Sequence, residues 1–109
     1  MSQRDDVRAV RLDRETNARL FHAVERFSPL FLTCHVLVET PGQVTDLYTV
    51  LLDGARVLRF ELPRSAEADP QAVEIFGVDQ FRQMIGQGKF QLMLDQAIQD
   101  YRSAFAEAR

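Results

Sequence analysis

Three side chains that could transfer a proton or hold an anion fall on neighbouring predicted strands: His35, Tyr48 and Arg59. Histidine exchanges protons near neutral pH, the tyrosine hydroxyl donates and accepts hydrogen bonds, and arginine grips carboxylates or phosphates with two donors. In the predicted register they form one row across a face of the sheet. The row predicts a shallow binding site for an anionic ligand or substrate. A solvated outer face, with Arg59 stacked on Tyr48, is the alternative that the sequence favours.

The next row of the same face places Asp46 opposite Glu61. Like charges directly opposed on a sheet are destabilising. Either the strands diverge at this point, or a cation such as Arg59 bridges the two carboxylates. Paired carboxylates that carry out acid–base or metal chemistry are a third option.

Other reactive residues are better explained by structure than by catalysis. Neighbours on a strand point to opposite faces, so Cys34 and His35 cannot form a thiol–imidazole pair, and we expect Cys34 in the core. Residues 86–89 resemble a phosphate-binding loop only in part, and they predict a hinge between helices. Two histidines without suitably spaced ligands do not make a metal site. We therefore predict no metal and no cofactor, and the sequence favours a binding module over an enzyme.

The turns and apolar periodicity predict the elements that must position these residues. A helix is expected over 14–27, and the segment 7–12 could be strand or helix. Period-two alternation predicts three strands at 30–39, 44–52 and 55–62. A turn centred on Pro41–Gly42 and a two-residue Asp53–Gly54 loop set the predicted register, in which Leu47 faces Phe60.

The remainder of the chain is predicted to be helical. A short helix is expected over 71–76, a second follows Asp79, and a long amphipathic helix covers 89–108. The fold class is α+β: an N-terminal helix, a three-stranded antiparallel β-meander, short helices and a long C-terminal amphipathic helix. Residues 1–109 are expected to form one domain, with 1–6 as a disordered tail.

Composition limits the class of protein. The chain has 109 residues, of which 46% are hydrophobic, and a net charge of -3. These values fit one globular domain and exclude a disordered or collagen-like chain. The acidic balance argues against nucleic acid as a partner. The start of the sequence has no apolar core of a signal peptide, and no stretch is long enough to span a bilayer, so we expect no membrane partner and a cytoplasmic location.

Apolar residues exceed what the predicted meander can cover. Part of the second sheet face and the long helix therefore predict an interface between two copies of the chain, and a monomer whose own helices cover both faces of the sheet is the alternative. Its expected residues are Phe31, Val50, Leu52, Val57, Phe90, Leu94, Tyr101 and Phe105.

We therefore expect a homodimeric, non-catalytic adaptor, chaperone-like or regulatory protein that binds a protein partner. The size, acidity and element order loosely resemble those of secretion chaperones, at the level of fold alone. Two alternatives remain open. One is a protein or enzyme that binds an anionic small ligand through His35, Tyr48 and Arg59. The other is a single-stranded nucleic-acid binder, against which the acidic residues on the sheet argue.

Overall fold

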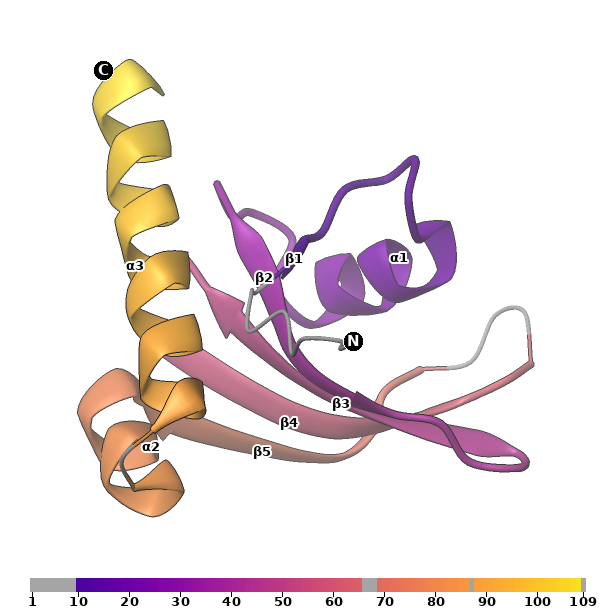
Figure 1. Cartoon of the computed structure of the whole chain (residues 1–109). Coiled ribbons are helices and arrows are strands. Elements are labelled where there is room, and N and C mark those ends of the chain that lie inside the picture. The colour runs from indigo at the N-terminus through magenta and orange to yellow at the C-terminus, as the bar shows by residue number, and fades with distance from the viewer. Residues whose placement is uncertain (1–9, 66–68, 87, 109) are drawn as a thin grey trace, which may run out of the picture.

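The computed structural model describes residues 10–65, 69–86 and 88–108 of the chain. In these ranges an antiparallel five-stranded sheet runs in chain order, β1-β2-β3-β4-β5, and three helices pack against it (Figure 1). The elements are β1 (Val10–Arg11), α1 (Ala18–Phe27), β2 (Cys34–Thr40), β3 (Thr45–Leu52), β4 (Arg56–Pro63), β5 (Gln71–Gly77), α2 (Val78–Ile85) and α3 (Lys89–Ala108). The predicted α+β class is confirmed, as are the bounds of the long C-terminal helix. The tail predicted at 1–6 lies outside the described residues.

The sheet has two strands more than the predicted meander, one at each edge. Val10 of β1 pairs with Val36, and Leu12 N donates to Cys34 O at 2.7 Å, so the described part of the ambiguous segment 7–12 is extended. At the other edge, the helix predicted over 71–76 is wrong. That segment is β5, which pairs with β4 through contacts such as Leu58 with Ile75. Its β-branched and aromatic residues favour a strand, and the free edge of β4 supplies the hydrogen bonds.

The first helix begins later than predicted because the chain makes a separate turn before it. The carboxylate of Asp13 accepts hydrogen bonds from the backbone N–H groups of Glu15 and Thr16, both at 2.8 Å. Asn17 then caps α1 by accepting from Leu20 N at 3.1 Å. The predicted helix start at residue 14 therefore corresponds to a capped turn, and α1 proper covers Ala18–Phe27.

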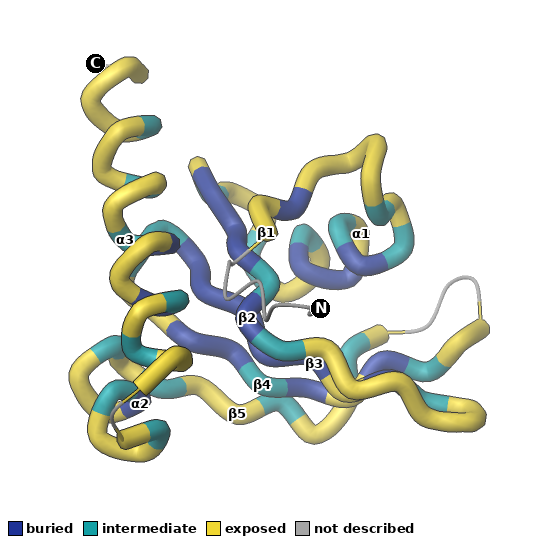
Figure 2. The backbone as a smooth tube through the Cα atoms, viewed as in Figure 1, coloured by how far each residue is buried: buried dark blue, intermediate teal, exposed yellow. Residues whose placement is uncertain are grey.

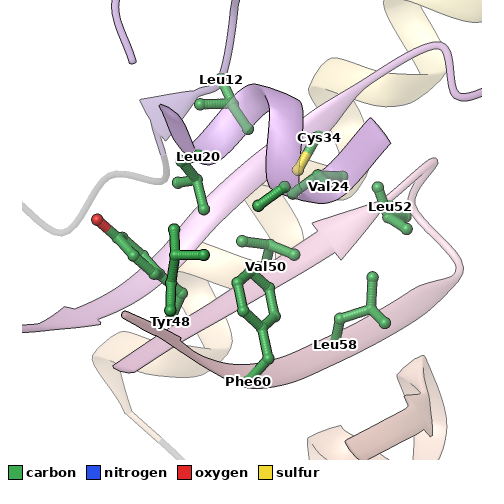
Figure 3. Packing of buried hydrophobic residues seen from close by; sticks show 11 residues of the cluster. Leu12, Leu20, Val24, Cys34, Tyr48, Val50, Leu52, Leu58 and Phe60 are labelled. Atoms are coloured by element: carbon green, nitrogen blue, oxygen red, sulfur yellow. The ribbon is translucent and has the colours of Figure 1, made fainter. Parts of the chain in front are cut away.

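Helices cover both faces of the sheet (Figure 2). On one face α1 closes the larger core, in which Leu20 and Val24 meet the sheet residues drawn in Figure 3. On the other face α2 and α3 close a second core, with Phe81 and Leu94 against Leu51. The sheet is thus the middle layer, and its strands alternate between two buried sides. In the described ranges, no helix is both long and apolar enough to cross a membrane.

The predicted register is wrong for β3: relative to β2 and β4, its side chains point to the face of the sheet opposite to the predicted one. Leu47 faces Glu61, not Phe60, and Leu52 faces Arg56. Asp53 and Gly54 both adopt positive φ, and Ala55 N donates to Leu52 O at 3.0 Å, as expected for a tight hairpin turn. Ala55 nevertheless stays outside the strand pairing, so the loop is one residue longer than predicted. A shift of one residue moves every side chain of a strand to the other face.

Candidate functional site

The three predicted ligand-binding residues do not lie together. Tyr48 points to the α1 face, where its ring packs 5.9 Å from that of Phe60. His35 pairs with Leu51 and Arg59 pairs with Thr49, on the α2/α3 face. The reversal of β3 is the physical reason, since it carries Tyr48 to the opposite side of the sheet. The predicted row of His35, Tyr48 and Arg59 is therefore absent.

His35 joins the sheet to the long helix. Its side chain is 2% exposed, and its Nε2 lies 2.7 Å from Oδ2 of Asp100 on α3. Arg11 Nε donates to the same oxygen at 3.0 Å, so β1, β2 and α3 meet at one carboxylate. The hydrogen bond from His35 is the main cause that holds the pKa of Asp100 below its ordinary value, with Arg11 adding to it. These contacts fasten α3 to the sheet and leave His35 closed to a ligand from solvent.

Asp46 is bridged by cations, but not by the predicted one. It faces Leu62 on the α1 side, and Glu61 lies on the opposite side, so the two carboxylates are not opposed. Arg64 donates to Asp46 Oδ1 through Nε at 3.1 Å and Nη2 at 2.9 Å, and Arg19 donates to Oδ2 at 2.9 Å. Gly42 N adds a fourth contact at 3.1 Å.

These donors explain the charge state of Asp46. The hydrogen bonds from Arg64, then Arg19, then the backbone of Gly42, lower the pKa of Asp46 to about 2. The carboxylate is ionised at neutral pH and its oxygens are already occupied. It holds α1 and the segment after β4 to strand β3, and it is poorly suited to act as an acid or base.

An apolar cleft on the α2/α3 face is the best-formed candidate for binding. It has a volume of about 220 Å³ and opens between the sheet and the corner where α2 turns into α3. Three strands and both helices line it, with Leu37, Val38, Leu47, Thr49, Arg59, Phe81, Ile85, Phe90 and Met93. Phe81 and Leu37 are buried in its wall, whereas Leu47 and Phe90 are 39% and 41% exposed at its rim.

A β-bulge shapes one wall of this cleft. The pairing of β2 with β3 shifts between Val36 and Val38, so that Leu37 and Val38 both line the cleft despite being consecutive. Strict alternation predicts Val38 on the other face, which is why the sequence did not group it with Leu37. Phe90 is the one residue of the cleft that the predicted interface already contained. The bulge has no sequence signal in this strand.

Arg59 is the only charged residue among those that line the cleft. Its Nε donates to Glu74 Oε1 at 2.9 Å, and its guanidinium carbon lies 5.5 Å from the centre of the Phe76 ring. Both partners belong to β5, the strand that the sequence did not predict. They hold the guanidinium in one orientation at the edge of an apolar surface.

The chain's own helices cover half of the predicted interface. Val50, Leu52 and Val57 are fully buried, and Leu94 is 1% exposed, so these residues are not available to a partner. This corrects the expectation that the second sheet face lacks cover: α1 covers Val50 and Leu52, and the α2/α3 layer covers Val57. Of the other predicted residues, Phe31 and Tyr101 are half-buried, and Phe90 and Phe105 are exposed.

The remaining reactive groups do not assemble into a further site. Cys34 lies in the core on the α1 face as predicted, and burial, with the charge of Asp53, raises the pKa of its thiol to about 12. A thiol held protonated is a poor nucleophile. Among the residues that the structure describes, no three His, Cys, Asp or Glu side chains come together to hold a metal ion.

Fold and cleft together define a class of architecture: an antiparallel sheet between helices, with an apolar recess at one helical corner. Comparison with known proteins adds no family to this description. No protein-family model matches the chain. No curated protein matches it in sequence, and no solved structure matches its fold.

Proposed function

We propose that the protein is a non-catalytic binding module of the cytoplasm, and that its cleft takes a large apolar side chain from a partner protein. The observation that carries this proposal is the cleft itself, with apolar walls and an exposed apolar rim at Leu47 and Phe90. A buried apolar anchor in a well-packed recess is the usual source of binding energy in protein interfaces.

The size of the cleft favours a side chain over a drug-sized ligand or a cofactor. Pockets for drug-sized ligands and cofactors usually enclose about 300–1,000 Å³. The cleft has about 220 Å³, which suits one anchoring residue whose neighbours lie across the rim. The rim residues would then be covered by the same partner.

The polar residues support a binding role over a catalytic one. Two of the side chains first expected to do chemistry are engaged elsewhere, His35 with Asp100 and Tyr48 with Glu39 at 3.3 Å, whereas Arg59 pairs with Glu74 through Nε alone. Tyr48 lies on the α1 face of the sheet, and His35 and Arg59 lie on the α2/α3 face in separate contacts. The alternative of an anionic-substrate enzyme that uses all three together therefore has no geometric support.

A library of random peptides displayed on phage tests the proposed cleft. We expect selection on the wild-type protein to enrich peptides that share one large apolar residue. Leu47→Asp places a charge at the rim without entering the core, and should weaken binding of the enriched peptides at least about tenfold, because the anchor would meet a desolvated carboxylate.

Val44→Asp is the matched control. Val44 precedes β3, is 75% exposed and does not line the cleft, so this variant should bind the peptides as the wild type does. If no peptides are enriched, or if the enriched peptides bind Leu47→Asp as tightly as the wild type, the proposed function is wrong.

Self-association is a second proposal, carried by the end of α3. The apolar stripe of this helix is buried at Leu94 and Ala97, and continues through Tyr101 and Ala104 to Phe105, which is 46% exposed. Figure 1 shows this part of α3 continuing beyond the ends of the strands. We propose that a second copy of the chain covers it, which would make the binding module a homodimer.

A further inference from the structure

We infer that the cleft distinguishes its partners by charge, and that Arg59 binds an aspartate or glutamate carboxylate placed beside the apolar anchor. This inference rests on the proposed function, since it names the chemistry of the segment that the cleft takes. It assigns to Arg59 a role as a specificity residue.

The position of Arg59 is the first argument. Its side chain lines the same cleft as Leu47 and Phe90 and is 38% exposed, so its charged end is within reach of a ligand. It also faces Thr49 directly across the β3–β4 pair, and Thr49 lines the cleft too. An anchor residue seated in the cleft would have its own chain neighbours next to this polar pair.

The second argument is that the guanidinium is already oriented. Glu74 accepts the Nε–H, and the guanidinium carbon lies over the Phe76 ring, 5.5 Å from its centre. The donors on the two terminal nitrogens are left for a ligand. Arginine binds carboxylates through two parallel N–H groups, and an oriented side chain loses less conformational entropy when it binds.

Charge complementarity favours a carboxylate on the partner. Arg59 is the one charged residue among those that line the cleft, and Glu74 on β5 pairs with its Nε alone, so a carboxylate of the partner would be the second to share this guanidinium. A single arginine suits a carboxylate better than a phosphate group, which carries nearly two charges and usually meets several cations. A basic residue at the same place on the partner would be repelled by Arg59, so the contact would exclude as well as select.

A matched pair of dyes tests the inference without a known partner. N-phenyl-1-naphthylamine is an uncharged aromatic probe, and 8-anilino-1-naphthalenesulfonate has the same rings with one sulfonate, which stands in for the carboxylate. Both fluoresce more strongly in apolar sites. We expect both to bind the wild-type protein, and the sulfonate about five- to tenfold more tightly, because it adds one charged hydrogen-bonded contact at a half-exposed site.

Arg59→Met removes the charge and keeps most of the length of the side chain. It should abolish the preference for the sulfonate while the uncharged dye binds as before. Arg56→Met is the matched control, since Arg56 is an exposed arginine of the same strand that does not line the cleft, and it should keep the preference. The preference should also fall as salt is raised, since the site is partly exposed.

The outcomes separate the two claims. Suppose that the uncharged dye binds the wild-type protein and that Leu47→Asp lowers its affinity. If the sulfonate dye then binds the wild type no more tightly than the uncharged dye, or is still preferred by Arg59→Met, the inference about Arg59 is wrong but the proposal for the cleft stands. If neither dye binds, or Leu47→Asp leaves both affinities unchanged, the proposed function itself fails.

Discussion

Asp46 shows how a buried charge can be structural. Its two oxygens accept hydrogen bonds from two arginines that lie outside the strands, and a backbone N–H group adds a further contact. Arg19 comes from α1 and Arg64 from the segment after β4, so one carboxylate joins three parts of the chain. Its contribution to folding must depend on its being ionised.

Acid should therefore weaken the wild-type protein through Asp46. The folded-state pKa of Asp46 is about 2, below its ordinary value of 3.8. A lowered pKa gives stability that is complete above about pH 4 and is lost as pH falls through about 2. We expect Asp46→Asn to be less stable than wild type at pH 7, and the difference to narrow between pH 4 and pH 2, as measured by urea unfolding.

Glu61→Gln is the control for this experiment, because Glu61 is an exposed carboxylate of the neighbouring strand. It should follow the acid response of the wild-type protein. A difference between Asp46→Asn and wild type that is as large at pH 3 and below as at pH 7 would contradict the role given to the ionised carboxylate.

At the scale of elements, the β3–β4 hairpin and α3 are fitted to each other at a glycine. Gly54 has φ of +64°, and a Cβ atom there would lie 2.8 Å from Cδ2 of Tyr101. The glycine therefore serves two needs, a left-handed turn and a close approach of the helix. Together with the contact of His35 with Asp100, this fixes where α3 crosses the sheet.

Gly54→Ala tests this fit. The positive φ costs alanine about 1 kcal/mol, and the close contact with the Tyr101 ring should bring the loss of unfolding free energy to about 2–3 kcal/mol. In a Tyr101→Ala background the same change should cost only about 1 kcal/mol, because the steric part has gone. Urea unfolding of the four proteins in the cycle measures both values. Equal costs in the two backgrounds would show that the ring does not press on the hairpin.

The chain as a whole covers its sheet on both sides. Figure 2 shows buried positions along the middle strands and mainly exposed ones along the second half of α3. The apolar excess that the sequence assigned to a partner is largely used within the chain, at Val50, Leu52 and Val57. The dimer proposal therefore concerns the end of α3, where Phe105 is 46% exposed.

Light scattering coupled to size exclusion should therefore give the mass of a dimer for the wild-type protein. Phe105→Glu places a charge on the exposed part of the stripe and should give a monomer with unchanged helical content, since Phe105 is outside the two cores. Gln99→Glu adds the same charge at an exposed position away from the stripe and should stay dimeric. A monomeric wild-type protein at about 100 μM would show that the dimer proposal is wrong, and it would not bear on the proposed function of the cleft.

The sequence by itself determined the elements whose signals are local. The long helix over 89–108, three of the strands and the core position of Cys34 follow from periodicity and from turn residues such as Asp53 and Gly54. The predicted start of α1 was too early because the sequence offers two helix-capping residues, Asp13 and Asn17, four positions apart. Asp13 caps a separate turn, and Asn17 caps the helix.

Only the tertiary structure decided which face each strand presents and where the edges of the sheet lie. The 71–77 segment became β5 because the open edge of β4 offered hydrogen bonds that no local pattern reports. The bulge at Leu37 and the additional loop residue at Ala55 are single-residue events, yet each one exchanges the faces of a strand. For this reason His35, Tyr48 and Arg59 do not form the predicted row. The cleft beside Arg59 is lined by five elements whose side chains meet only after folding.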